Sequence, residues 1–413
     1  MSVQFKSITE LRAMLDDKLI SASELTEESF QLAKKYKELN CFVTMNEELG
    51  KKNANTIDLD NESNSMLAGI PLAQKDLFCT EGLRTTCSSK ILANFIPPYS
   101  ATAVKKLEDA GSITIGKTNM DEFAMGSSNE TSFFGNVHNP WKKGYVPGGS
   151  SGGSAAAVSA GIVPAATGTD TGGSIRQPAA HCGITGLKPT YGRVSRWGMI
   201  AFASSLDQAG PLARTAEDCA ILLNAMSGHD LKDTTSLNST VPDFSENINQ
   251  PLDGLKIGII KEFNLDDLDK EVQARFEDSK RAYEKLGAQF IEVSLPNISA
   301  SVPTYYSIAP AECSSNLSRF DGVRFGYRAE DTDDLNDLYI KSRSEGFGDE
   351  VKRRILIGTY ALSAGYYDAY YKKAQQVRRL IKNDFDNVFK SVDILMTPTS
   401  PNTAFKFGSK GSQ

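Results

Sequence analysis

The sequence predicts an α/β protein in which helices cover a central sheet. From Gly69 onward, short apolar runs with strand character alternate with helical stretches, an order typical of a layered α/β fold. Of the 413 residues, 40% are hydrophobic and 23% are charged, which is ordinary globular composition with enough apolar residues for a large core. The predicted strands are Ile70–Ala73, Ile113–Ile115, Val163–Ala166, Leu255–Ile260, Phe290–Val293 and Val392–Met396.

Two domain segments are predicted. Residues 1–65 form an N-terminal helical arm, in which Ser21 and Glu24 make a capping-box pattern ahead of a long helical run. Residues 66–413 form a single core domain with a polar surface connection near residues 229–254. The later helices predicted from apolar spacing are Lys270–Leu286 and Gly365–Val388.

Charge and targeting signals exclude several classes of protein. The net charge of −6 disfavours broad direct binding to nucleic acid phosphates, which depends on clustered Lys and Arg. No secretory signal is visible, and the most apolar stretch, Ala155–Gly168, is too short to cross a bilayer. The six cysteines form no C-x-x-C pair, and no histidine stands at a metal-ligand spacing from them. We expect a cytoplasmic protein with reduced cysteines, no metal site and no membrane contact.

Two glycine clusters and one lysine carry most of the functional information. The clusters are Gly148–Ser154, with the sequence GGSSGGS, and Asp170–Arg176, with the sequence DTGGSIR. Glycine lets main-chain N–H groups gather around a small anion or a carbonyl oxygen, so a serine in such a cluster is a candidate nucleophile. A single Gly-Gly-Ser is more simply a tight turn, but two copies of this composition make that explanation weak.

One segment matches the phosphate-binding loop pattern. Gly111–Thr118 satisfies G-x-x-x-x-G-K-[ST], which alone suggests an ATPase or GTPase. That mechanism needs a strand before the first glycine and a helix after the lysine. Here the residues from Ser100 to Ala110 predict a helix that ends at Gly111, and a β-branched strand follows. We therefore expect no phosphate loop.

A second segment matches a nucleophile elbow. Gly148–Gly152 fits G-x-S-x-G, which requires an apolar strand running into the turn. Residues 139–147 contain two prolines and a glycine instead, and neither His181 nor His229 has a setting that marks it as the base. A Ser-His-Asp triad is therefore disfavoured.

Lys75 offers a different base. It ends the apolar run from Gly69, so it is predicted to stand at the end of a buried strand, where desolvation lowers the pKa of a lysine. A neutral lysine can accept a serine proton. The alternative is a surface lysine paired with Asp76. Thr171, Gly172, Gly173 and Ser174 could direct successive N–H groups at one oxygen as an oxyanion hole.

Taken together, these motifs closely resemble the amidase signature family. The resemblance is carried by GGSSGG from Gly148, by GTDTGGSIRQP over Gly168–Pro178, and by Lys75. It implies the amidase-signature fold, a central mixed sheet with helices on both faces. It also implies a Ser-Ser-Lys triad, in which Ser174 forms the acyl-enzyme, Ser150 bridges on a cis peptide after Gly149, and Lys75 is the base.

Within this family the chain resembles the glutamine-hydrolysing A subunits of aspartyl/glutamyl-tRNA amidotransferases. The similarity runs along most of the chain and includes Gly116–Gly126, Tyr305–Gly322 and Gly348–Ile355. It implies a heterotrimer with subunits B and C, in which this chain releases ammonia from glutamine and needs no cofactor. The partner then uses ATP and Mg²⁺ to amidate misacylated Glu-tRNA(Gln) or Asp-tRNA(Asn), and contacts most of the tRNA.

The same resemblance implies a glutamine pocket. Arg354 would hold the α-carboxylate, a task that suits the planar guanidinium, and Tyr305 with Met125, Gly126 and Ser127 would line the pocket. Family members continue past Gln413, so we expect a C-terminally shortened fold without the acidic residue for the α-amine. Two alternatives stay open: a stand-alone hydrolase of small amides, and a non-catalytic subunit that keeps only partner binding.

Overall fold

The computed structural model describes residues 3–59 and 65–410, which divide into two compact units. The first unit comprises residues 1–246, 316–353 and 404–413, and the second comprises residues 247–315 and 354–403. The boundary predicted at residues 65/66 therefore lies inside the first unit. Among the described residues, no helix has the length and apolar character needed to cross a membrane.

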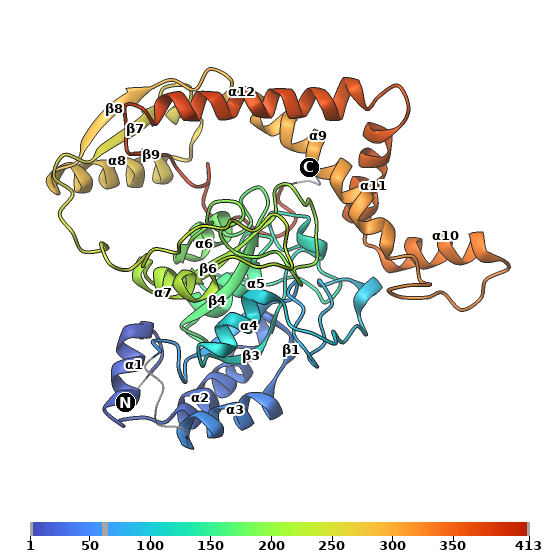
Figure 1. Ribbon diagram of the computed structural model, residues 1–413, viewed down its shortest axis with the longest axis horizontal. Coiled ribbons are helices and arrows are strands. Elements are labelled where there is room, and N and C mark those ends of the chain that lie inside the picture. The colour runs from blue at the N-terminus through green and yellow to red at the C-terminus, as the bar shows by residue number, and fades with distance from the viewer. Residues whose placement is uncertain (1–2, 60–64, 411–413) are drawn as a thin grey trace. The chain divides into compact units, whose positions relative to one another are not determined.

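A six-stranded mixed sheet forms the centre of the first unit (Figure 1). Its order is β1-β3-β2-β4-β6-β5, with β2 parallel to β3 and β4 and the other pairs antiparallel. Three of the strands match predicted runs, whereas β1, β5 and β6 were not predicted. The strands are β1 Phe42–Met45, β2 Pro71–Lys75, β3 Ile113–Thr118, β4 Ala165–Asp170, β5 Thr185–Gly186 and β6 Gln208–Ala213.

Helices cover the sheet, as predicted. Helix α5 packs on β2, β3, β4 and β6, and it shares an apolar core with α2 and α3. The predicted arm supplies α1 to α3 and also strand β1 at the sheet edge, so it is not purely helical. The helices are α1 Ile8–Asp16, α2 Ala22–Lys35, α3 Glu47–Leu59, α4 Thr102–Asp109, α5 Gly152–Ser159, α6 Arg176–Cys182, α7 Ala216–Met226 and α10 Leu335–Gly346, with 3₁₀ turns η1 Lys37–Leu39, η2 Lys90–Leu92, η3 Glu122–Ala124 and η6 Leu317–Arg319.

The composition of α5 explains why it can lie so close to the strands. All eight of its residues are glycine, alanine, serine or valine, and all are buried. A Cβ at Gly153 would approach the main-chain O of Cys41 to 2.6 Å, closer than real side chains come. Small side chains therefore let the helix that follows Ser150 pack directly against the sheet.

The second unit has its own small sheet. Strands β7 Lys256–Ile260, β8 Gln289–Val293 and β9 Ile394–Met396 are all parallel, in the order β8-β7-β9, and each matches a predicted run. An apolar cluster that includes Ile260, Val293 and Val388 forms its core. The helices and turns are α8 Lys270–Lys285, α9 Ser301–Asn316 and α12 Lys373–Val388, with η4 Leu265–Asp267, η5 Ile298–Ala300 and the π-helix η7 Asp368–Lys372, while α11 Asp349–Leu362 starts in the first unit and continues into the second.

Candidate active site

Lys75 is the last residue of β2, and its side chain is fully buried. Its Nζ lies 2.7 Å from the hydroxyl of Ser150, 2.9 Å from that of Ser151 and 2.8 Å from that of Thr169. The structure therefore brings together the predicted base and the predicted bridging serine. A neutral amine has one lone pair and two N–H groups, so it can accept from one of these hydroxyls and donate to the other two.

The surroundings of Lys75 favour this neutral state. Burial lowers its pKa to about 7, and the negative charges of Asp121, Asp170 and Asp207 oppose that shift without reversing it. Its hydrogen-bond partners are hydroxyl and carbonyl oxygens, none of them a carboxylate. With a pKa near 7, the amine can lose its proton at neutral pH and act as a base.

The first glycine cluster holds Ser150 against the lysine. The Gly149–Ser150 peptide bond is cis, as the family resemblance implied. Gly148 has φ +80°, and a Cβ there would lie 2.7 Å from Cα of Pro178, so glycine is needed for both conformation and space. A Cβ at Gly149 would collide with the carboxylate of Asp121. These glycines let the main chain turn sharply with α6 and Asp121 packed against it.

Asp170 organises the second glycine cluster. Its carboxylate accepts hydrogen bonds from the main-chain N–H groups of Gly173 at 2.8 Å and Ile175 at 3.1 Å. It also forms an ion pair with Arg176 at 2.9 Å, and hydrogen bonds from that side chain help hold its pKa below the usual range despite burial. One charged side chain therefore shapes the loop that carries Ser174.

The structure corrects one predicted oxyanion donor. The N–H of Gly173 is already bound to Asp170, so it is not free to hold an oxyanion. In the part of the chain that the structure describes, the N–H groups of Thr171, Gly172 and Ser174 have no hydrogen-bond acceptor. These three remain as candidate donors. The Thr171 hydroxyl donates to Asp207 at 2.6 Å, which fixes the start of the loop.

Ser174 is the member of the predicted triad that solvent reaches. It is 7% exposed, whereas Lys75 and Ser150 are 0% exposed. The carbonyl O of Ser174 accepts the N–H of Ser151 at 3.1 Å, so the two glycine clusters are joined next to the bridging serine. Exposure therefore increases from Lys75 to Ser174. This order suits a transfer of the Ser174 proton inward to Lys75 while Ser174 faces the substrate.

The structure excludes the phosphate-loop interpretation, as expected from the sequence. Gly111 follows helix α4 with φ +87°, and Lys117 lies within strand β3 with its side chain fully buried. The Lys117 amine donates to the carbonyl O of Phe78 and to the hydroxyl of Thr85. A phosphate could not reach this amine.

The predicted pocket residues fall into two groups. Met125, Gly126 and Ser127 follow η3 in the first unit, and a Cβ at Gly126 would collide with the Asp121 carboxylate. The N–H of Asp121, the residue before η3, donates to the carbonyl O of Ser150 at 3.2 Å. Tyr305 on α9 and Arg354 on α11 belong to the second unit.

Four residues that contact the triad or shape its loops were not predicted from the sequence. Ser151 and Thr169 bind the lysine amine, Asp121 accepts the main-chain N–H of Asn129, and Asp207 accepts a hydrogen bond from the Thr171 hydroxyl. Burial raises the pKa of Asp121 and of Asp207 to about 6. The positions of Ser151 in the first cluster and of Thr169 beside Asp170 were the available signals.

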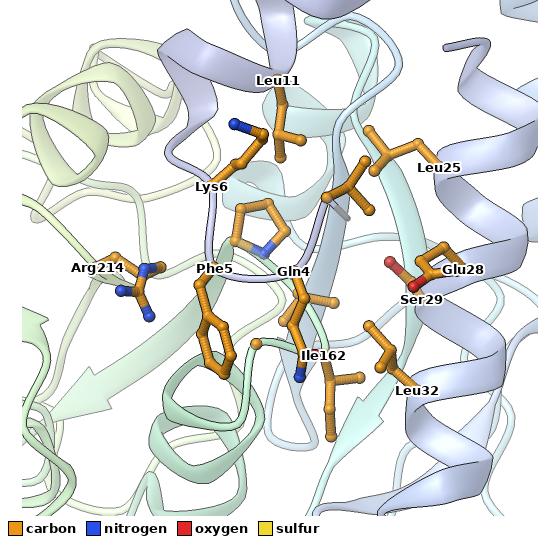
Figure 2. Close-up of a pocket in the computed structure, with 14 residues that line it drawn as sticks. Gln4, Phe5, Lys6, Leu11, Leu25, Glu28, Ser29, Leu32, Ile162 and Arg214 are labelled. Atoms are coloured by element: carbon orange, nitrogen blue, oxygen red, sulfur yellow. The ribbon is translucent and has the colours of Figure 1, made fainter. Parts of the chain in front are cut away.

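Two cavities of the first unit lie away from this site. Figure 2 shows the first, a space of about 10 Å³ lined by residues that include Phe5, Leu25, Ile162 and Arg214. The second, about 430 Å³, is lined by residues of α1 to α3 and their connections, such as Arg12 and Asp58. Neither is lined by a member of the triad. The site is therefore identified by its chemistry and not by cavity size.

With this geometry established, comparison with known proteins places the chain in a family. Residues 24–413 match the family model described as Amidase, and the chain belongs to this family. It is 60% identical to the A subunit of glutamyl-tRNA(Gln) amidotransferase from Alcanivorax borkumensis, over 98% of this chain and 84% of that protein. Its counterpart from Hahella chejuensis is also 60% identical, with the same coverage. The crystal structure of the corresponding glutamyl-tRNA(Gln) amidotransferase chain from Thermotoga maritima is similar with a TM-score of 0.82 and 42% identity, covering 100% of this chain and 83% of that one.

Proposed function

We propose that this chain is the A subunit of a glutamyl-tRNA(Gln) amidotransferase and that it hydrolyses glutamine to supply ammonia. The observation that carries the chemistry is the 2.7 Å contact between the buried Lys75 amine and the Ser150 hydroxyl. The similarity to named A subunits over 98% of the chain supports the choice of substrate and pathway step.

The reaction follows from the order of the residues. Lys75 takes the proton of Ser150, Ser150 takes that of Ser174, and the Ser174 oxygen forms a bond to the side-chain amide carbon of glutamine. The N–H groups of Thr171, Gly172 and Ser174 would hold the oxyanion. When the tetrahedral intermediate collapses, the C–N bond breaks and ammonia leaves with a proton returned along the same path.

Water completes the cycle. It attacks the acyl carbon, its proton passes to the same Ser-Lys relay, and glutamate leaves as Ser174 regains its hydroxyl. In this proposal the lysine alternates between neutral and protonated forms in both halves of the reaction. A base with a pKa near 7 can do so at low energetic cost at neutral pH.

Substrate selection is assigned to residues outside the triad. Arg354 would bind the α-carboxylate of glutamine, and Tyr305 with the loop Met125–Ser127 would line the pocket. Arg354 also lies 5.9 Å from the ring centre of Tyr306, a contact typical of an arginine held over an aromatic ring.

We further propose that the chain works with subunits B and C. Ammonia would pass to the partner that amidates misacylated tRNA with ATP and Mg²⁺, so the ATP chemistry and most tRNA contacts belong to that partner. The net charge of −6 supports this division, since it disfavours phosphate binding by this chain.

The test is ammonia release from glutamine by the purified chain, with and without its partner subunits. Ser174→Ala should abolish release, whereas Ser159→Ala should retain it, because the Ser159 hydroxyl binds the Cys182 carbonyl O at the far end of α5. Full activity in Ser174→Ala would overturn the proposal. Efficient hydrolysis of aliphatic amides without partners would instead indicate a stand-alone amidase, and partner binding without acylation of Ser174 would indicate a non-catalytic subunit.

A further inference from the structure

Glu122 is a buried carboxylate that the proposed chemistry does not use. It is 2% exposed and begins the turn η3, next to Asp121. Its Oε1 accepts a hydrogen bond from the hydroxyl of Ser89. The main-chain N–H of Gly348 donates to both carboxylate oxygens, Oε1 at 3.1 Å and Oε2 at 2.9 Å. The carboxylate therefore binds a segment more than 200 positions further along the chain.

The contact leaves no room for a side chain on the partner segment. A Cβ at Gly348 would collide with the Glu122 carboxylate, so the close approach requires glycine. The neighbouring residues add an apolar contact, since the rings of Phe123 and Phe347 lie 5.7 Å apart with an edge-on geometry. Hydrogen bonds and ring packing thus fix the same short segment.

The fixed segment is the start of helix α11. Gly348 directly precedes Asp349, the first residue of that helix, and Arg354 lies six positions after Gly348. At a rise of about 1.5 Å per residue, the two are separated by about 9 Å along the axis. Arg354 therefore lies on the same continuous helix whose start the Glu122 contact holds.

The turn η3 also leads into the other proposed pocket segment. Its last residue, Ala124, is followed directly by the loop Met125–Ser127. The N–H of Met125 donates to the carbonyl O of Glu122 at 2.9 Å. The main-chain carbonyl of Glu122 therefore binds the start of this loop, whereas its carboxylate binds the residue before α11.

We infer that Glu122 is a positioning residue for glutamine recognition, which acts by fixing the start of α11 and thereby Arg354. The inference rests on the proposed function, because it takes Arg354 as the ligand of the α-carboxylate. It separates binding from chemistry: Glu122 orients the substrate-binding helix, whereas Lys75, Ser150 and Ser174 carry the reaction.

A conservative variant distinguishes hydrogen bonding from charge. In Glu122→Gln, the amide oxygen can accept the N–H of Gly348, and the amide N–H₂ can donate to the Ser89 hydroxyl. Burial raises the pKa of Glu122 to about 7, so the site already tolerates a side chain without a full charge. Glu122→Gln should therefore keep both contacts, and Glu122→Ala should lose both.

The experiment measures kcat and KM for glutamine with the chain in complex with its partner subunits. Glu122→Ala should raise KM about tenfold, the loss expected when a buried N–H loses its acceptor, with kcat within about threefold of wild type. Glu122→Gln should stay within about threefold of wild type in both constants. Labelling of Ser174 by a fluorophosphonate, which needs the triad but no carboxylate site, should proceed at the wild-type rate in both variants.

Asp218→Ala provides a matched control for general loss of stability. The buried Asp218 carboxylate accepts the N–H of Ile8, the first residue of α1, at 2.9 Å, so it holds another helix start in the same way. This variant should leave KM for glutamine unchanged. Hydrogen exchange of residues 346–353 should accelerate in Glu122→Ala and not in Asp218→Ala.

The outcomes separate this inference from the proposed function. If the wild-type complex released no ammonia from glutamine, the proposed function would fail, while hydrogen exchange would still report whether Glu122 holds the start of α11. If the wild type is active, an unchanged KM in Glu122→Ala would overturn the inference. So would an equal loss of kcat and of Ser174 labelling, because Glu122 would then act on the triad.

Discussion

The first unit buries two lysines on adjacent strands, and their surroundings differ. Lys75 on β2 pairs with Thr118 on β3, and Gln74 pairs with Lys117. Since successive strand residues point to opposite faces of a sheet, the two lysines lie on opposite faces. Lys75 is surrounded by hydroxyls, whereas the amine of Lys117 lies 3.8 Å from the carboxylate of the fully buried Asp76.

The difference teaches that burial alone does not make a lysine into a base. Burial lowers the pKa of both lysines, but only Lys117 has a carboxylate within ion-pair distance to oppose the shift. Asp76 in turn accepts hydrogen bonds from the Thr86 main chain and hydroxyl. Lys117 therefore belongs to a structural ion pair, and Lys75 is available for proton transfer.

The largest effect is expected from Lys75→Met. Removing the base should lower kcat for glutamine hydrolysis by at least about a hundredfold, the usual contribution of a positioned general base. The unbranched methionine fills similar space, and the three hydroxyls can bind one another, so the protein should stay folded. Steady-state ammonia release and a thermal melt check both points; retained turnover in a folded variant would remove Lys75 from the mechanism.

Lys117→Met should show the opposite pattern. Without its cation, Asp76 is left as a buried carboxyl without a charge partner, and the free energy of unfolding should fall by about 3 kcal/mol. Turnover per folded molecule should remain within about threefold of wild type, because Lys117 does not touch the triad. Denaturant unfolding measures the loss. A stable but inactive Lys117→Met would contradict the distinction between the two lysines.

Asp170→Asn tests whether the loop that carries Ser174 also contributes to activity at the Lys75 site. An amide cannot accept all the N–H groups that the carboxylate holds and it loses the ion pair with Arg176, so the loop carrying Ser174 should shift. We expect kcat to fall roughly thirtyfold, which corresponds to an activation free energy higher by about 2 kcal/mol. This is a fraction of the cost of deleting oxyanion donors. The control is Asp243→Asn, an exposed carboxylate that binds Asn224 and Ser245. Equal activity in the two variants would show that Asp170 does not organise the site.

Much of this site was predictable because the chemistry sits in local sequence patterns. The glycine clusters mark where the main chain must turn tightly, and the position of Lys75 at the end of an apolar run predicted its burial. Six predicted runs became strands because continuous β-branched and apolar residues have few other solutions. The cis peptide at Gly149 came from the family resemblance and not from local propensity.

The unpredicted parts depend on contacts between distant residues. Strand β6, with the sequence QAGPLA, lacks β-branched residues and is a strand because it pairs with β4 along its whole length. The bond from Gly173 to Asp170 removed a predicted oxyanion donor, which only the folded loop could show. Glu122 likewise gave no signal, since its partner Gly348 lies far away in the sequence.

The pH dependence of Ser174 acylation tests the central claim most directly. Below a pH of about 7 the Lys75 amine carries a proton and cannot accept another, and above it the amine is neutral. The rate of fluorophosphonate labelling should therefore rise about tenfold per pH unit on the acid side and level off above pH 7 to 8. Lys75→Met should be slow and should lack this inflection. A wild-type rate that is flat from pH 5.5 to 9, or the same inflection in Lys75→Met, would contradict the assignment of Lys75 as the base.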